Sequence, residues 1–311
     1  MKREALKIAD RISVLVEGKE IPVNNPDKLL WPAAGVTKLQ YITYLTAVAP
    51  FIVPYTKGRM AMLWRYGNGI GGEKTEERSV YGHPPDWVPT IVYQGKRRIM
   101  LDDEATLIWY AATREALEIH VPFDRYERKD YPTELVFDLD PAGAGDFAFV
   151  RTVALEVKRT LDSLGLLSFA KTSGATGMQI YVPIEDKYTY EETRKINTFI
   201  AEYLVQKMPG RLTLDRVVER RGAKLYFDYL QLWRGRTMVV PYTVRARPAA
   251  TVSAPVAWEE VERGFVPEHF TIRNMIGRVR TIGDMFSTVT ERDPKYLQNL
   301  DGILSFINAH R

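Results

Sequence analysis

Two acids interrupt an otherwise apolar run at residues 135–141, whose sequence is LVFDLDP. Successive side chains of an extended strand point to opposite faces, so Asp138 and Asp140 share one face about 6 to 7 Å apart. Leu135, Phe137 and Leu139 share the other face, and a strand ends readily at Pro141 because proline has no N–H to donate. The pattern predicts a strand with an apolar back and an acidic front.

Helices are predicted where apolar residues recur at helical spacing behind a capping signal. Thr37 with Gln40 forms a capping box, and we expect its helix to end before Pro50, which lacks a backbone donor. Thr189 with Glu192 caps another helix in the same way. The other predicted helices are residues 103–116 and 146–164, the second with Asp146 as its N-cap.

The predicted strands indicate an α/β (α+β) fold of two lobes, one of them with a sheet like that of an RNA-recognition motif (RRM-like). From residue 134 onward the order is strand, helix, strand, strand, helix, strand, which is the split βαβ arrangement. In such a sheet the strand of Asp138 can lie beside the strand of Asp228. The predicted strands are residues 12–16, 21–23, 60–66, 97–101, 119–121, 135–140, 166–171, 178–183, 225–230 and 237–242, and residues 67–72 are a glycine-rich loop.

Asp228 is the one acid in a second apolar strand, YFDYL at residues 226–230, and would add a third carboxylate to the acidic face. Neighbouring carboxylates repel one another unless a cation neutralises them, and oxygen ligands suit Mg²⁺ or Mn²⁺. Two such ions activate an attacking hydroxyl and stabilise a leaving oxygen in phosphoryl transfer. The acids therefore predict a two-metal site, and a surface strand with solvated aspartates is the alternative.

Basic residues cluster close to this strand in the sequence. Lys and Arg number 43 against 39 Asp and Glu, and the net charge of +4 permits a polyanionic partner without requiring one. Guanidinium groups bind phosphates through paired hydrogen bonds, although a solvated basic surface would have the same composition. The clustered residues are Arg220, Arg221, Lys224, Arg234, Arg236, Arg245 and Arg247.

A phosphate site is predicted at the start of the helix that Thr37 opens. Residues 25–28 read as a turn, so Lys28 and Lys38 flank the helix start. The first amides of a helix are unpaired and carry partial positive charge, which attracts phosphate. Solvated surface lysines are the alternative.

The chain has few other chemical signals. Without cysteine it cannot form disulfides, thiolate zinc sites or a cysteine nucleophile. It has no secretory signal and no apolar run of about 18 residues, so we expect a cytoplasmic protein with no membrane segment. His120, one of 4 histidines, would by itself be explained by a structural role.

These motifs together resemble one family, the primase-like polymerase domain of bacterial end-joining ligase D in the archaeo-eukaryotic primase superfamily. The resemblance extends from Asn25 to about Val261, with the motifs in the family's order. The matching motifs are NPDK at 25–28, EIH at 118–120, LVFDLDP at 135–141, KTSG at 171–174, FDYLQ at 227–231, PYTVRARP at 241–248 and VSAPVAWEE at 252–260.

The resemblance implies a role for each matching residue. The metal-binding catalytic acids would be Asp138, Asp140 and Asp228. The nucleotide-binding residues would be His120, Lys171, Ser173, Gly174, Gln179, Gln231 and Arg245. A DNA 5′-phosphate would be held by Asn25, Lys28 and Lys38, and Arg221 would be a loop arginine near the active site.

The glycine loop departs from the family pattern. Thr176 and Gln179 replace a lysine and a histidine that would meet the triphosphate. Without two charge-assisted hydrogen bonds, at about 1.5 to 3 kcal/mol each, nucleotide binding would be weaker unless Lys171, Arg245 and backbone amides compensate. Gln179 can still donate a hydrogen bond. Residues 75–77 (TEE) replace a paired aromatic, so base stacking is not expected there.

The implied function is template-directed nucleotidyl transfer onto a DNA 3′-hydroxyl, which fills gaps and extends broken ends in non-homologous end joining. The resemblance implies Mn²⁺ or Mg²⁺, ribonucleotides in preference to deoxyribonucleotides, a Ku-type end-binding partner and a separate DNA ligase. No ligase motif is evident, so we expect a free-standing polymerase in the cytoplasm, associated with the nucleoid when bound to DNA.

We expect one compact polymerase domain in three segments. Residues 1–133 form an N-terminal α/β lobe with the 5′-phosphate pocket, residues 134–248 the RRM-like catalytic lobe, and residues 249–311 a C-terminal segment packed on both. The alternative functions are a de novo primase, a DNA-end-binding scaffold with a weakened polymerase, and a metal-dependent phosphohydrolase.

Overall fold

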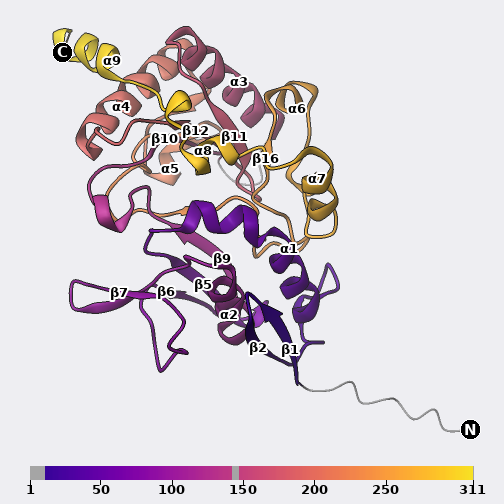
Figure 1. The fold of residues 1–311 in the computed structure, drawn as a ribbon. Helices are drawn as coiled ribbons and strands as arrows, with labels where there is room; N and C mark the ends of the chain where they lie inside the picture. Colours follow the sequence, from indigo (N-terminus) through magenta and orange to yellow (C-terminus); the bar gives the residue numbers. More distant parts are fainter. Residues whose placement is uncertain (1–10, 142–146, 311) are drawn as a thin grey trace, which may run out of the picture.

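The structure is a computed structural model that describes residues 11–141 and 147–310, and it contains two main sheets with helix α1 (Lys38–Thr56) between them (Figure 1). The lower sheet in Figure 1 consists, in spatial order, of β15 (Met238–Val239), β9 (Ala116–Val121), β5 (Met62–Ile70) and β6 (Lys74–Glu77). The upper sheet consists of β13 (Leu212–Thr213), β14 (Leu225–Asp228), β10 (Glu134–Asp140), β12 (Met178–Pro183), β11 (Phe169–Thr172) and β16 (Pro255–Val256).

The upper sheet has the predicted RRM-like order. Along the chain β10 is followed by α3 (Phe147–Ser163), β11, β12 and α4 (Tyr190–Lys207), and then, after the short elements β13 and α5 (Val218–Arg221), by β14. In space β14 and β12 flank β10, both antiparallel to it, and β11 lies beyond β12. The predicted neighbourhood of the two acidic strands is therefore confirmed.

The two faces of β10 differ as the alternation predicts. Its apolar face is fully buried, with Phe137 against Phe227 of β14 at 5.9 Å between ring centroids. On the other face, Glu134 accepts a hydrogen bond from the Tyr55 hydroxyl of α1 at 2.8 Å and pairs with Arg59 at 3.1 Å. These buried contacts turn the acidic face of β10 toward α1.

Helix α2 (Glu104–Arg114) packs on α1 and on the predicted N-terminal hairpin. Asp103 caps α2 by accepting a hydrogen bond from the Thr106 amide at 2.6 Å. The strands outside the two main sheets are β1 (Arg11–Val16) paired with β2 (Lys19–Asn24), β3 (Leu29–Trp31) with β4 (Val36–Thr37), and β7 (Thr90–Tyr93) with β8 (Lys96–Ile99).

The predicted end of the first helix is wrong. The capping box of Thr37 and Gln40 is present, but α1 continues through Pro50 and Pro54 to Thr56. Ile52 and Tyr55, in the continued turns, are buried. Packing of these turns against the core outweighs the hydrogen bonds that the two prolines cannot donate.

Several strand predictions need correction. β11 begins at Phe169, later than the predicted strand at residues 166–171, and β14 ends at Asp228, so residues 229–230 of the predicted strand lie in a turn. β5 extends to Ile70, into the predicted glycine loop. The strand needs glycine at position 69, because Gly69 has φ +68° and a Cβ there would lie 2.7 Å from the Leu30 carbonyl oxygen. The predicted strand at residues 237–242 is reduced to β15, and β15 pairs with β9 of the lower sheet.

The C-terminal region lies against both lobes through short helices. They are α6 (Trp258–Arg263), α7 (Met275–Ile282), α8 (Ser287–Glu291) and α9 (Asp301–Ala309). The division of the chain at residues 133 and 248 stays a prediction. β15, from the predicted catalytic lobe, joins the lower sheet, and β16, from the predicted C-terminal segment, joins the upper sheet. Asp146, the predicted N-cap of α3, lies outside the described residues. Over the described ranges, no helix combines the length and apolar character needed to cross a membrane.

Candidate active site

Asp138 of β10 and Asp228 of β14 are strand partners, directly opposite each other. Asp140 lies on the same face of β10 as Asp138, and its own partner across the strands is Tyr226. The structure thus brings the three predicted acids together at one end of the upper sheet. The strand pairing does this although Asp228 is far from the other two in sequence.

Burial and neighbouring charge raise the pKa values of two of the acids, Asp138 and Asp140. Burial and the charges of Asp228 and Asp140 raise the pKa of Asp138 to about 7. Partial burial raises the pKa of Asp140. The positive charge of Arg221 acts to lower this pKa, and the negative charge of Asp228 acts to raise it. A concentration of negative charge of this kind favours a bound cation.

The acids fit a divalent metal in chemistry, but each has a protein partner. The Gln179 amide donates to Asp138 Oδ1 at 3.1 Å, and the Tyr226 hydroxyl donates to Asp228 Oδ1 at 3.0 Å. Asp140 lies 3.8 Å from Arg221 Nη1. Over residues 11–141 and 147–310, no three His, Cys, Asp or Glu side chains are grouped closely enough to hold an ion as they stand. The carboxylates would have to rotate toward a common point to bind one.

Arg221, at the end of α5 (Val218–Arg221), lies beside the acids, as the resemblance implies. Its guanidinium is 3.8 Å from the Tyr226 ring centroid and donates to the carbonyls of Asp215 and Arg216 at 3.0 and 3.1 Å. These contacts hold a positive charge near Asp140.

His120 lies on β9, in the lower sheet, and belongs to a buried polar cluster. Its ring stacks on Trp64 at 4.5 Å, and its Nε2 is 3.2 Å from Glu118 Oε2. Arg245 Nε lies 3.0 Å from the same oxygen. Burial lowers the pKa of His120, and the charge of Arg245 adds to that effect.

Glu118 is a further residue of this cluster, and the sequence does not predict it as a site residue. Burial acts to raise the pKa of Glu118, but the His120 hydrogen bond, the Arg245 charge and the Ala246 amide lower it to about 2. Glu118 is thus the anion that orients His120 and Arg245. Its signal in the sequence is its place in the EIH motif at residues 118–120, directly before His120.

The glycine loop touches the acidic strand. A Cβ on Gly177 would lie 2.2 Å from the Leu139 carbonyl oxygen, and a Cβ on Gly174, at φ +67°, would lie 2.7 Å from the Ser253 backbone nitrogen. The Ser173 hydroxyl accepts from the amides of Ala175 and Gly177 at 3.1 and 3.0 Å. These amides, which were expected to help neutralise a triphosphate, are therefore used within the loop.

Lys171 links the glycine loop to the acids. It is fully buried and donates to Gln179 Oε1 and, at 2.7 Å, to the Ser253 hydroxyl. Burial and the charge of Arg245 lower the pKa of Lys171 well below its ordinary value. Because Gln179 uses its oxygen for Lys171, its amide nitrogen points to Asp138. Gln231 also borders this region, donating to the Thr237 carbonyl at 2.9 Å.

Lys28 and Lys38 converge, as predicted, but on a carboxylate. Lys28 Nζ donates to both oxygens of Glu115 at 2.8 Å, and Lys38 Nζ lies 3.4 Å from Oε1. Asn25 is exposed in the turn, with φ +52°. The amides at the start of α1, which the prediction assigned to phosphate, donate hydrogen bonds to other groups of the protein.

The first amides of α1 all have partners. The Lys38 amide donates to the Lys28 carbonyl at 2.8 Å, and the Leu39 amide donates to the Pro26 carbonyl at 2.9 Å. The Gln40 amide donates to the Thr37 hydroxyl at 3.3 Å. Any affinity of this region for phosphate must come from the two lysine side chains.

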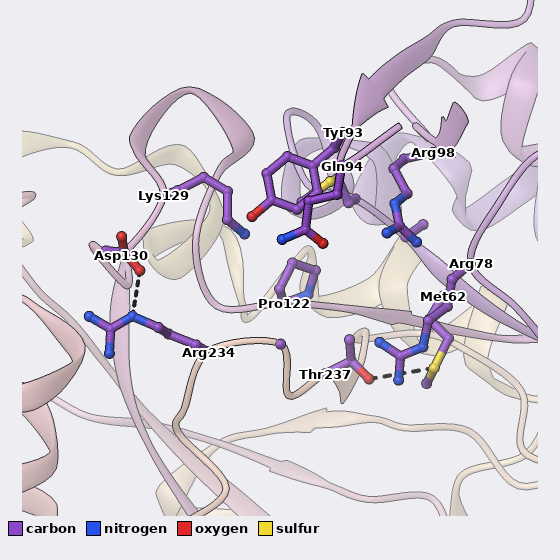
Figure 2. Close-up of a pocket in the computed structure, with 13 residues that line it drawn as sticks. Met62, Arg78, Tyr93, Gln94, Arg98, Pro122, Lys129, Asp130, Arg234 and Thr237 are labelled. Atoms are coloured by element: carbon purple, nitrogen blue, oxygen red, sulfur yellow. Dashed lines mark hydrogen bonds and ion pairs between the residues drawn. The ribbon is translucent and has the colours of Figure 1, made fainter. Parts of the chain in front are cut away.

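A cavity of about 430 Å³ lies between the β7–β8 hairpin, the start of β5 and the segment before β15 (Figure 2). Arg234 is neutralised by Asp130 and by Glu191, whereas no carboxylate in the described part of the chain pairs with Arg78 or Arg98. Met62 on its wall is the strand partner of His120, so the cavity adjoins the buried polar cluster of His120, Glu118 and Arg245. The lining cations are Arg78, Arg98, Lys129 and Arg234.

Residues 37–286 match the family model described as LigD, primase-polymerase domain. The chain is similar to the Bifunctional non-homologous end joining protein LigD of Bacillus subtilis (strain 168), with 36% identity over 261 residues, which cover 84% of this chain and 42% of that protein. It is 29% identical over 284 residues to the Multifunctional non-homologous end joining protein LigD of Mycolicibacterium smegmatis, covering 89% and 37%. The chain thus spans less than half the length of these relatives.

Among solved structures, the chain is similar to the polymerase domain from Mycobacterium tuberculosis Ligase D in complex with DNA. The TM-score is 0.79 and the identity 29%, with 88% of this chain and 98% of that chain covered.

Proposed function

Because the chain belongs to the family of LigD primase-polymerase domains, we propose that it is a metal-dependent nucleotidyltransferase that extends a DNA 3′-hydroxyl as a template directs. The observation that carries the proposal is the pairing of Asp138 with Asp228 across β10 and β14, with Asp140 on the same face. In the reaction the 3′-oxygen bonds to the α-phosphorus of a nucleoside triphosphate, the bond from that phosphorus to the α–β bridging oxygen breaks, pyrophosphate leaves, and the hydroxyl proton passes to water.

Asp138, Asp140 and Asp228 would hold Mg²⁺ or Mn²⁺. When bound, the ions would activate the 3′-hydroxyl and neutralise charge on the leaving pyrophosphate. The pKa of Asp138 is raised first by burial and then by the charges of Asp228 and Asp140, and the acids on the shared face support this assignment because a cation would neutralise them. Asp140 would exchange its contact with Arg221 for a metal.

The nucleotide would lie between the acids and the His120 cluster. Arg245 is fixed by Glu118 and by the Ser173 carbonyl, so its guanidinium is already oriented for a triphosphate. Lys171 lies buried behind Gln179 and holds its amide in place by donating to Oε1. The remaining residues that we assign to this pocket are Ser173, Gly174 and Gln231.

The substrate we propose is DNA with a gap or a broken end. In support, the similar solved domain is described in complex with DNA, and the similar full-length proteins are named for non-homologous end joining. Lys28 and Lys38, with Asn25 nearby, would bind the 5′-phosphate. A Ku-type end-binding protein, a separate DNA ligase and a preference for ribonucleotides complete the proposal, and the reaction would take place on DNA in the cytoplasm.

The basic cavity of Figure 2 would take a DNA strand close to the nucleotide site. Arg78 and Arg98 supply charge that no carboxylate of the described residues offsets, and Tyr93 and Gln94 line the cavity on the same β7–β8 hairpin as Arg98 (Figure 2). Phosphates of a backbone bind such cations without regard to sequence.

Primer extension on gapped DNA tests the proposal. We expect the wild-type protein with Mn²⁺ or Mg²⁺ to add ribonucleotides and deoxyribonucleotides, and Asp138→Asn or Asp228→Asn to abolish addition while DNA binding persists. Asp162→Asn, on exposed α3, is the matched control. Extension by the Asp138 and Asp228 variants at the wild-type rate would refute the site, and synthesis without a primer would indicate a primase.

A further inference from the structure

Glu115 occupies the centre of the lysine pair that we assign to the 5′-phosphate. Its two oxygens accept from Lys28 Nζ at 2.8 Å each, and Oε1 is 3.4 Å from Lys38 Nζ. Lys28 also donates to the Gly67 carbonyl. An ammonium group has three protons, so no donor of Lys28 is left over for a ligand.

This ion-pair cluster is enclosed. Only 4% of the Lys38 side chain and 14% of the Glu115 side chain are exposed. Burial lowers the pKa of Lys38, and the charge and hydrogen bond of Glu115 oppose that effect. The Lys28 side chain is 26% exposed, but the enclosed Lys38 requires a counter-charge, and Glu115 supplies it when no phosphate is bound.

The backbone of Glu115 cannot move away easily. Glu115 caps α2 in the left-handed conformation at φ +52°, and its amide donates to the Tyr110 carbonyl. Its carbonyl accepts from the Tyr66 amide at 3.3 Å. The side chain alone is free to rotate outward and leave the two lysines to another anion.

We propose that Glu115 is a built-in competitor for the 5′-phosphate and makes the site selective for a dianion. The proposal rests on the proposed function of Lys28 and Lys38. A terminal phosphate carries about −1.5 to −2 charges at pH 7, whereas a phosphodiester carries one. The terminal group therefore displaces Glu115 from both lysines, and a diester of the continuous backbone does not.

The alternative is that Glu115 positions the lysines for the phosphate. The two roles predict opposite effects of removing the Glu115 charge on the affinity for phosphate. Removing a competitor strengthens phosphate binding, whereas removing a positioning group weakens it.

The test measures dissociation constants at one fixed salt concentration, for labelled DNA whose recessed 5′ end carries a phosphate, a hydroxyl or a methyl phosphodiester. The proteins are the wild type, Glu115→Gln and Glu104→Gln, the last being the same change at the opposite end of α2. We expect Glu115→Gln to bind the phosphate end about fivefold more tightly or better, which is the effect of one charge at a few ångströms. Binding of the hydroxyl end should not change.

The methyl phosphodiester end tests selectivity directly. Wild type should bind it like the hydroxyl end, and Glu115→Gln should bind it more tightly than the hydroxyl end. Glu104→Gln should behave as wild type throughout. Glu115→Asn provides a second variant that suits the left-handed backbone, because asparagine tolerates φ > 0 better than glutamine, and it should shift binding in the same direction.

Two results would overturn the inference, and they are distinguishable. In the first, wild type prefers the phosphate end, but neither Glu115 variant binds that end more tightly than wild type. Glu115 is then not a competitor, although the phosphate site itself is supported. If neither wild type nor any variant distinguishes the phosphate end from the hydroxyl end, the site itself is wrong.

Discussion

Asp138 and Asp228 are directly opposed across two antiparallel strands, and the pKa of Asp138 is raised to about 7 by burial first and by Asp228 next. The sheet thus holds like charges together, which costs stability unless a cation joins them. A site organised for metal binding has this property, whereas a purely structural sheet gains nothing from it.

The first prediction concerns stability and pH. The pKa of Asp138 is near 7 in the folded protein against an ordinary value of 3.8, so the folded state binds more protons between these values and stability falls as the pH rises through them. Metal-free Asp138→Asn should therefore melt above wild type at pH 8 and close to it at pH 4. Mn²⁺ should raise the wild-type melting temperature at pH 8 and leave the variant nearly unchanged. A melting-temperature difference between wild type and Asp138→Asn that does not vary with pH would contradict the raised pKa of Asp138.

The second prediction concerns the lysine pair. Lys28→Ala with Lys38→Ala should abolish discrimination between phosphorylated and unphosphorylated gaps, because both charges face one anion site. The plot of log K against log salt should become shallower by about 0.9 for each phosphate charge that the variant no longer neutralises. Lys57→Ala, at the other end of α1, should change neither measurement. Continued discrimination by the double variant would place the 5′-phosphate elsewhere.

The third prediction concerns the glycine loop. Thr176→Lys should lower the apparent KM for the nucleotide by about tenfold and raise kcat less, since an added charge near the triphosphate strengthens ground-state binding. The loop amides of Ala175 and Gly177 cannot substitute, because Ser173 uses them. An unchanged KM would show that Lys171 and Arg245 already neutralise the triphosphate.

Gln179 requires separate treatment, because it connects Lys171 to Asp138. Gln179→His shortens this connection and removes the amide pair that faces both partners. We expect that change alone to lower kcat, and the combination with Thr176→Lys to gain less than Thr176→Lys alone. A combined variant that exceeds Thr176→Lys would show that the amide bridge is dispensable.

The fourth prediction concerns the basic cavity. Arg78→Ala with Arg98→Ala should weaken DNA binding and reduce its salt dependence, by about 0.9 in slope for each phosphate charge left without a cation, while the preference for a 5′-phosphate persists. Arg280→Ala, on the exposed face of α7, is the matched control. Loss of the 5′-phosphate preference would mean that the cavity and the lysine pair form one site.

The fifth prediction concerns Gly177. An added Cβ would lie 2.2 Å from the Leu139 carbonyl oxygen, so Gly177→Ala should push the loop away from β10 and destabilise the fold by about 1 to 3 kcal/mol. Gly277→Ala, where nothing lies within 4 Å, should stabilise α7 by about 0.5 to 1 kcal/mol. Chemical denaturation measures both, and equal effects of the two changes would rule out the close approach.

The sequence by itself determined the features that depend on neighbouring residues. Asp138 and Asp140 share a face because alternation is a property of any extended backbone. The capping boxes at Thr37 and Thr189 form because each joins residues three positions apart. The order of strands and helices also predicted the RRM-like sheet, and with it the pairing of the strand of Asp228 with that of Asp138.

Tertiary structure alone decided which distant charges meet. Glu115 is 87 positions from Lys28, and Glu118 is 128 from Ala246, so no local pattern could pair them. Packing also carried α1 through two prolines and assigned β15 to the lower sheet. Local propensities are worth a fraction of a kcal/mol per residue, whereas burying an apolar side chain or pairing a buried charge is worth about 1 to 3 kcal/mol, so long-range packing decides wherever the two disagree.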